Sequence, residues 1–168
     1  MVKKTDYPGG QAIFLSGFVI NDRIYVGMGS ANGIQGSTDF YEYDPAIDSW
    51  IKKAPFIGHS RQACIGFTLS EYGYIGGGEE NYRDVFTDFY KYDPKLDFWT
   101  LDTTKILTDS ATTAWCSSFV LNNIAYYGLG AKFHNNGLRF SKSFFRFEFP
   151  FETPINTSKN QINTNPIK

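Results

Sequence analysis

The sequence predicts an all-β fold built from repeated, four-stranded antiparallel sheets. The segment at residues 39–50, DFYEYDPAIDSW, returns 49 residues later at residues 88–99 as DFYKYDPKLDFW. A fixed period of this length is typical of repeat architectures. Aromatic residues make up 18% of the chain and 16 residues are glycine, a composition typical of short strands joined by tight turns. The period and the composition together predict several copies of one sheet-forming unit.

The second repeat, approximately residues 62–103, shows this unit most clearly. Its predicted strands are four short apolar or aromatic segments, residues 64–69, 74–78, 88–93 and 98–101. Glycine, proline and aspartate separate the segments, and a polar loop lies between the second and the third. This order predicts a four-stranded antiparallel meander, which is the blade of a β-propeller.

The first repeat, approximately residues 11–54, has the same four parts, whereas the third, approximately residues 113–150, has only three. No Asp-x-Trp strand closes the third repeat. By the 49-residue period, residues 1–5 align with residues 50–54. We therefore interpret residues 1–5 as a stray fourth strand, the strand that the third repeat lacks. Residues 151–168 are rich in Asn, Thr, Lys and Pro, and we predict an extended or disordered tail.

The repeats resemble the kelch family, in which a glycine pair ending the second strand accompanies a Tyr and a Trp in the third and fourth strands. The matching residues are Gly77, Gly78, Tyr92 and Trp99 in the second repeat, Gly27, Gly29, Tyr43 and Trp50 in the first, and Gly128, Gly130 and Phe147, without a Trp, in the third. The resemblance covers roughly residues 1–150. It implies about three kelch-type β-propeller blades, the last of them incomplete in sequence.

Three blades form only part of a closed propeller, so an apolar blade face is expected at each end of the array. Large exposed apolar faces indicate a partner surface. One hypothesis is a head-to-tail homodimer in which residues 1–5 of each chain complete the third blade of the other. The alternative is that the remainder of a longer propeller covers both faces. The sequence leaves both alternatives open.

The overall charge and hydropathy exclude several function classes. A net charge of −1 and a pI near 6.1 give no basic patch for nucleic acid or an anionic membrane. No apolar run approaches the ~20 residues that a membrane helix needs. No apolar segment follows the first lysines, so no signal peptide is visible and the compartment stays open.

Loops on one face of the blades are the expected binding surface, because binding groups concentrate on loops held by a rigid scaffold. The loops between strands two and three and the connections between blades lie on this face. The candidate ligand-binding residues there are Arg61, Glu79, Glu80, Asn81, Arg83, His134, Asn135 and Arg139. The kelch resemblance suggests that Arg61 faces a central channel. A structural hydrogen bond from Arg61 to the blade backbone is the alternative that we favour.

No metal, cofactor or catalytic site is predicted. The two histidines, His59 and His134, lie in separate repeats without the ligand spacing of a metal site. Cys64 and Cys116 occupy equivalent strand positions and are expected to act as small buried hydrophobes.

The leading functional interpretation is therefore a non-catalytic interaction module that binds a protein or a glycan through its loops. An enzyme is the less favoured reading. Some kelch relatives resemble galactose oxidase, which would need a copper site that this sequence lacks. Others resemble sialic acid mutarotase, which would need only a few polar groups lining the channel. The third alternative is a purely structural half-propeller completed by a second chain.

Overall fold

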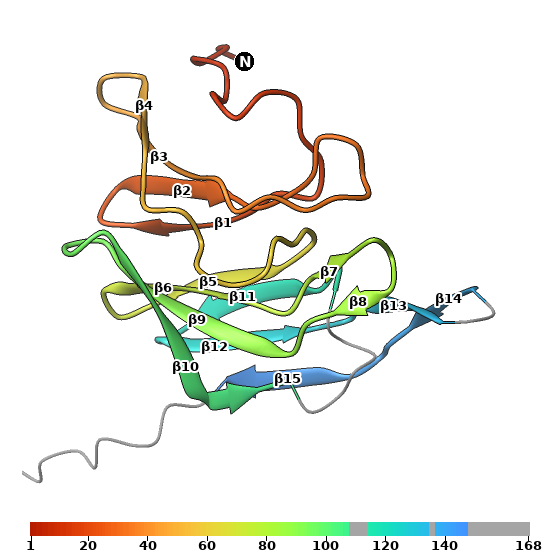
Figure 1. Cartoon of the computed structure of the whole chain (residues 1–168). Coiled ribbons are helices and arrows are strands. Elements are labelled where there is room, and N and C mark those ends of the chain that lie inside the picture. The colour runs from red at the N-terminus through yellow and green to blue at the C-terminus, as the bar shows by residue number, and fades with distance from the viewer. Residues whose placement is uncertain (108–113, 135–136, 148–168) are drawn as a thin grey trace, which may run out of the picture.

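The computed structural model describes residues 1–107, 114–134 and 137–147. The regular elements in these ranges are all β-strands (Figure 1). Blade 1 contains β1 (Ser16–Ile20), β2 (Arg23–Gly27), β3 (Phe40–Asp44) and β4 (Ser49–Lys52). Blade 2 contains β5 (Ile65–Leu69), β6 (Tyr72–Gly76), β9 (Asp88–Asp93) and β10 (Phe98–Ile106). Blade 3 contains β11 (Ser117–Leu121), β12 (Ile124–Gly128) and β15 (Phe144–Phe147). In each blade, neighbouring strands pair antiparallel in chain order, which confirms the predicted all-β fold.

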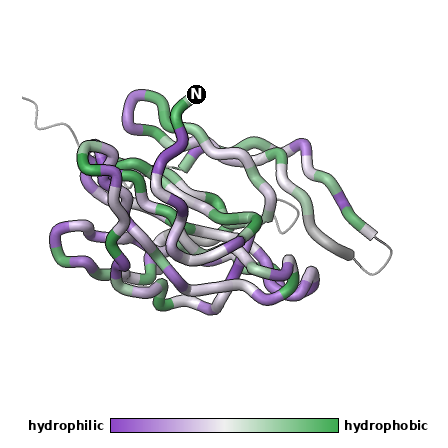
Figure 2. The backbone as a smooth tube through the Cα atoms, turned by 90° about the horizontal axis from the view of Figure 1, so that it is seen from above, coloured by the Kyte–Doolittle hydropathy of each residue, from purple (hydrophilic) through white to green (hydrophobic). Residues whose placement is uncertain are grey.

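Two short hairpins extend the loops between the second and third strands of blades 2 and 3. One is formed by β7 (Glu79–Glu80) and β8 (Asp84–Val85), and the other by β13 (Ala131–His134) and β14 (Gly137–Phe140). Both project from the same side of the stack (Figure 1). Seen from above, hydrophilic residues recur in the turns at the edge of the molecule (Figure 2).

The blades stack face to face, with β5 between β1 and β11 (Figure 1). We call the face that a blade turns toward the following blade its front face, and the opposite one its back face. The front of blade 1 and the back of blade 2 share one aromatic core, formed mainly by Phe18, Ile20, Tyr25, Phe40, Ile75, Tyr90, Tyr92 and Trp99. The front of blade 2 and the back of blade 3 share the second, formed mainly by Ile65, Phe67, Leu69, Tyr74, Phe89, Ala125, Tyr127 and Phe147.

The kelch-like residues have direct structural roles. Tyr92 packs against Trp99 with ring centroids 4.9 Å apart, and Tyr43 packs against Trp50 at 4.8 Å. The second glycine of a pair makes room for the residue that precedes the first strand of its own blade. A Cβ on Gly78 would lie 2.8 Å from Cys64 Sγ, closer than real Cβ contacts allow, and Gly78 also has a positive φ of 90°.

The connection from blade 1 to blade 2 is anchored by a small group of hydrogen bonds. Asp97 Oδ1 accepts from the Ala54 amide at 3.0 Å and from the Tyr92 hydroxyl at 2.6 Å. The indole of Trp99 donates to the Ala54 carbonyl at 3.2 Å. The Phe56 ring then packs edge-on against Trp99, at 5.2 Å.

The N-terminal segment repeats these contacts on blade 1, 49 residues earlier. Asp48 Oδ1 accepts from the Thr5 amide at 3.0 Å and from the Tyr43 hydroxyl at 2.6 Å. The indole of Trp50 donates to the Thr5 carbonyl at 3.1 Å, and the Tyr7 ring packs edge-on against Trp50 at 5.4 Å. The segment from residue 5 onward therefore lies where a chain leaving a preceding blade would lie.

Two of the predicted segments remain predictions. Residues 1–5 are not paired with a strand within the part of the chain that the structure describes. The tail at 151–168 lies outside the described residues. Among the described residues, no helix is long and apolar enough to span a membrane.

Candidate functional site

The loop face is formed where the loops of blades 1 and 2 meet. The Asn81 amide donates to the Ile34 carbonyl at 3.0 Å, which ties the β7–β8 hairpin to the loop between β2 and β3. Isolated bridges pair Ser37 with Arg61 and Gln62 with Glu79. These backbone contacts hold the loops of two successive blades in one surface.

Arg61 lies beneath this surface rather than on it, and it is fully buried. Its guanidinium donates to both carboxylate oxygens of Asp88, at 2.6 and 3.2 Å, and to the Gly77 carbonyl at 3.0 Å. The same group lies 4.1 Å from the centroid of the Phe86 ring. Burial on its own would raise the pKa of the Asp88 carboxyl, but the hydrogen bonds and charge of Arg61 lower it below its ordinary value. The arrangement is a structural crosslink, the alternative that we favoured for Arg61 on sequence grounds.

Glu79 is also buried, with 2% of its surface exposed. Its carboxylate accepts from Gln62 Nε2 at 2.6 Å and from the Tyr82 amide at 2.6 Å. Burial raises the pKa of the Glu79 carboxyl above its ordinary value, and these two hydrogen bonds offset only part of that rise. Gln62 Nε2 also donates to the Gly33 carbonyl at 2.9 Å, so the amide links blade 1 to the base of the hairpin.

The exposed tip of the β7–β8 hairpin carries the remaining candidates of blade 2. Asn81 and Arg83 are exposed, whereas Glu80 is half-buried and accepts from the Ser60 hydroxyl at 2.5 Å. The structure thus separates the predicted set into buried residues that hold the hairpin, Arg61 and Glu79, and residues at its surface.

The candidates in the third repeat lie on the β13–β14 hairpin. Arg139 is exposed on β14. His134 ends β13, and Asn135 lies outside the described residues. Both hairpins project on the same side of the stack (Figure 1).

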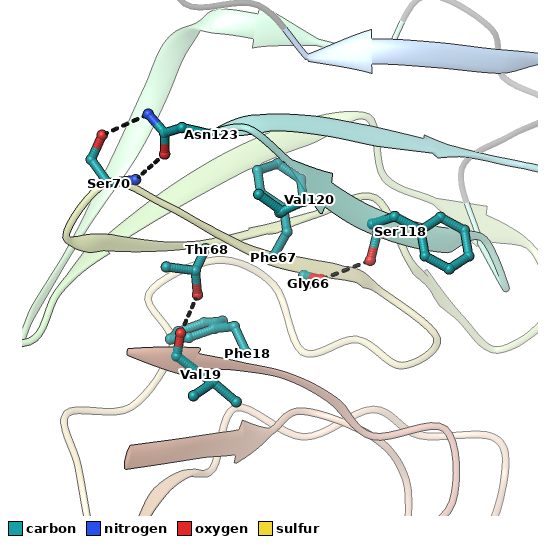
Figure 3. A pocket seen from close by; sticks show the side chains of 10 residues that line it. Phe18, Val19, Gly66, Phe67, Thr68, Ser70, Ser118, Val120 and Asn123 are labelled. Atoms are coloured by element: carbon teal, nitrogen blue, oxygen red, sulfur yellow. Dashed lines mark hydrogen bonds between the residues drawn. The ribbon is translucent and has the colours of Figure 1, made fainter. Parts of the chain in front are cut away.

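A hollow along the inner strands was not anticipated from the sequence. It has a volume of about 420 Å³, lies between β1, β5 and β11, and is open to solvent (Figure 3). Its polar groups join one blade to the next: Thr68 Oγ1 donates to the Val19 carbonyl at 2.6 Å, and Ser118 Oγ donates to the Gly66 carbonyl at 2.7 Å. The only sequence signal was the presence of hydroxyl residues inside otherwise apolar strands.

The described residues do not bring together a metal-binding group, and burial suppresses the reactivity of Cys64. Within residues 1–107, 114–134 and 137–147, no three His, Cys, Asp or Glu side chains converge as a metal site would need. Cys64 is buried and reduced, and burial raises the pKa of its thiol to about 12. A thiol with such a pKa is not a nucleophile at neutral pH, which agrees with its expected role as a small hydrophobe.

A comparison with solved structures supports the fold. The chain matches the structure of YjhT with a TM-score of 0.60 and 28% sequence identity over 78% of this chain. It spans 37% of the length of the YjhT chain. The likeness supports a kelch-type β-propeller fold in the matched region. No family model matches the chain, and no curated protein matches its sequence.

Proposed function

We propose that the chain is a non-catalytic interaction module that binds a protein or a glycan through the tip of the β7–β8 hairpin. The observation that supports this function is the contrast between the base and the tip of the hairpin. Its base is fixed by Arg61 and Glu79, which are buried and hydrogen-bonded, whereas Asn81 and Arg83 point polar groups to solvent from a fixed backbone. Preorganised polar groups lose little entropy when a ligand binds.

The chemistry of the tip favours a ligand that carries a carboxylate. The guanidinium of Arg83 offers planar paired donors that match a carboxylate, and the Asn81 amide can both donate and accept. An acidic peptide side chain and an acidic sugar both present such a group.

A glycan panel and a library of acidic peptides, each probed with the purified chain, test this function. Specific binding should fall at least about tenfold in Arg83→Glu. The control is Lys95→Glu, which reverses an exposed charge in the β9–β10 turn at the other end of blade 2. Binding that is equally sensitive to Lys95→Glu, or insensitive to Arg83→Glu, would contradict the proposal.

The second candidate is a sugar-active enzyme of the sialic acid mutarotase type, which the kelch resemblance raises. The inner-strand hollow is the feature that favours it, since a sugar site needs a concave surface with polar groups. The hydroxyl groups of Thr68 and Ser118 already donate hydrogen bonds between blades, so they cannot donate to a sugar, which argues against the enzyme. Measuring anomer exchange of N-acetylneuraminic acid by NMR decides the point: acceleration by the chain over buffer would favour the enzyme.

We also propose that further blades complete the arc, supplied by a second copy of the chain or by the remainder of a longer propeller. A purely structural role is the third candidate. It predicts completion of the ring with no specific capture in the binding screens.

A further inference from the structure

The front face of blade 3 is an exposed aromatic and aliphatic surface. Phe119 is 60% exposed, Leu121 62% and Phe144 53%, while Tyr126 is half-buried. The pairing of Phe119 with Tyr126 and of Gly128 with Phe144 places these side chains on one face of the sheet. Soluble monomers rarely expose a contiguous apolar surface of this kind without a partner.

The same positions are buried in the other two blades. Strand pairing aligns them as Phe18, Ile20, Tyr25 and Phe40 in blade 1, Phe67, Leu69, Tyr74 and Phe89 in blade 2, and Phe119, Leu121, Tyr126 and Phe144 in blade 3. All eight residues in blades 1 and 2 are buried against the next blade. Blade 3 therefore presents a surface of the kind that two other blades use to bind a following blade.

The back face of blade 1 has the matching half of that contact. Phe18 of blade 1 packs against Tyr92 and Trp99 on the back of blade 2, and its ring centroid lies 6.2 and 6.5 Å from theirs. Blade 1 has the same aromatic pair, Tyr43 and Trp50, and there Trp50 is only half-buried, whereas Trp99 is 1% exposed. Val19, on the back of β1, is 57% exposed.

The N-terminal segment supplies a second, independent complementarity. Because Thr5 and Tyr7 occupy on blade 1 the places that Ala54 and Phe56 occupy on blade 2, the residues before Thr5 point to the edge of whatever blade precedes blade 1. Blade 3 has three strands among the described residues, and β15 is at its edge. If residues 1–4 pair with β15 in the register in which β4 pairs with β3, residue 2 lies opposite Arg146.

We propose that two copies of the chain close head to tail into one ring. The front of blade 3 in each copy packs on the back of blade 1 in the other, and residues 1–4 of each copy add a fourth strand to the partner's β15. Phe119 then contacts the aromatic pair formed by Tyr43 of the partner subunit and Trp50 of the partner subunit. Two such contacts related by a two-fold axis leave no unpaired blade face.

One position distinguishes the contact between subunits from the contacts within the chain. The pocket that receives the phenylalanine has Gly73 in blade 2 and Ala125 in blade 3, and Phe18 fills the space that a Cβ on Gly73 would need. Blade 1 has Ile24 at this position, 38% exposed. The larger side chain must hold Phe119 farther out than Phe18 and Phe67 lie, which loosens the contact. Ile24→Ala is therefore expected to tighten the dimer.

Sedimentation velocity over a concentration series, without any ligand, tests the ring. The wild-type chain should sediment as a species of twice the 19.0 kDa of one chain. Phe119→Arg should weaken association by roughly 100-fold or more, because it places a charge in an aromatic contact that occurs twice in the ring. The control is Leu96→Arg, at an exposed apolar residue in the β9–β10 turn that lies on neither face. Circular dichroism establishes that each variant retains its β structure.

Disulfide trapping tests the strand exchange separately. The pair Val2→Cys with Arg146→Cys should form a cross-link between subunits, whereas Val2→Cys alone should not. A wild-type chain that stays monomeric at every concentration, or a dimer that Phe119→Arg leaves intact, would overturn the proposal. Failure of the ring would leave the loop-face function standing, because the binding screens and the sedimentation series report on different surfaces.

Discussion

Blades 2 and 3 carry the same kinds of residue on their front faces, yet one face is buried and the other is exposed. Phe67 is 4% exposed and Phe119 is 60% exposed, although both stand at the same position of the first strand. The strand pattern alone therefore decides which side chains share a face, and the neighbouring blade decides whether that face is core or surface. An exposed residue with a buried equivalent marks a contact that the described chain leaves unmade.

Replacing the equivalent phenylalanines should give the largest difference. Phe67→Ala removes a ring from the core between blades 2 and 3, where its centroid lies 5.0 Å from that of Phe147. The substitution should cost about 3–5 kcal/mol of unfolding free energy. Phe119→Ala should cost less than about 1 kcal/mol in dilute solution, because its ring has no such core around it. Urea denaturation at low protein concentration measures both. Similar losses for the two variants would contradict the comparison.

The buried Arg61 should give the next largest effect, and it belongs to blade 2 alone. Ala12 stands at the same place of the repeat in blade 1. Arg61→Met leaves Asp88 without its ion pair and should cost about 3 kcal/mol. The folded state holds the pKa of Asp88 below its ordinary value, so the stability it adds is present at neutral pH and is lost as pH falls through the lowered pKa. When the unfolding free energy is measured as a function of pH, its decrease toward acid pH should be smaller in Arg61→Met than in the wild-type chain.

The two anchoring aspartates test whether the N-terminal segment acts as a blade connection. Asp97→Ala removes acceptors for Ala54 and Tyr92 and should cost about 1–2 kcal/mol. Asp48→Ala removes the same bonds to Thr5 and Tyr43, but at a more exposed site, and should therefore cost less unfolding free energy than Asp97→Ala. Proteolysis of the N-terminal segment should nevertheless accelerate in Asp48→Ala, and an unchanged cleavage rate would show that the segment is not anchored there.

The buried Glu79 should give the smallest effect, and one of opposite sign to Asp88. Its raised pKa means that the folded state binds the proton more tightly than the unfolded state. Stability should therefore fall as pH rises from the ordinary value of a glutamate through the raised one. Glu79→Gln should flatten this part of the profile, whereas Glu80→Gln, which removes a neighbouring charge that adds a smaller part of the rise in the Glu79 pKa, should only reduce it.

The sequence was sufficient to predict the blades because each strand and turn has a local chemical cause. The return of Tyr43 and Trp50 as Tyr92 and Trp99 identified the third and fourth strands of two blades, and the pairing registers confirm those strands. The contacts of Thr5 with Asp48 repeat those of Ala54 with Asp97, whereas the fourth strand that the alignment predicted for residues 1–5 stays a prediction.

The candidate site was less predictable, because burial depends on contacts between segments far apart in the chain. The sequence placed Arg61 and Glu79 in exposed loops. In the structure both are buried, because Arg61 pairs with Asp88 and Glu79 accepts a hydrogen bond from Gln62. The inner-strand hollow depends on how three strands from three blades meet, which no local pattern encodes. Asn81 and Arg83, by contrast, lie at a hairpin tip, where a loop pattern suffices to predict exposure.

Hydrogen exchange of β15 tests the central claim most directly, because in the proposed ring residues 1–4 of the second copy add a strand to the outer edge of β15. If a second copy adds residues 1–4 to this edge, protection of both the N-terminal segment and residues 144–147 should rise together with protein concentration. Deleting residues 1–4 should abolish the rise at residues 144–147. Exchange at β15 that is independent of concentration in the full chain would contradict the account.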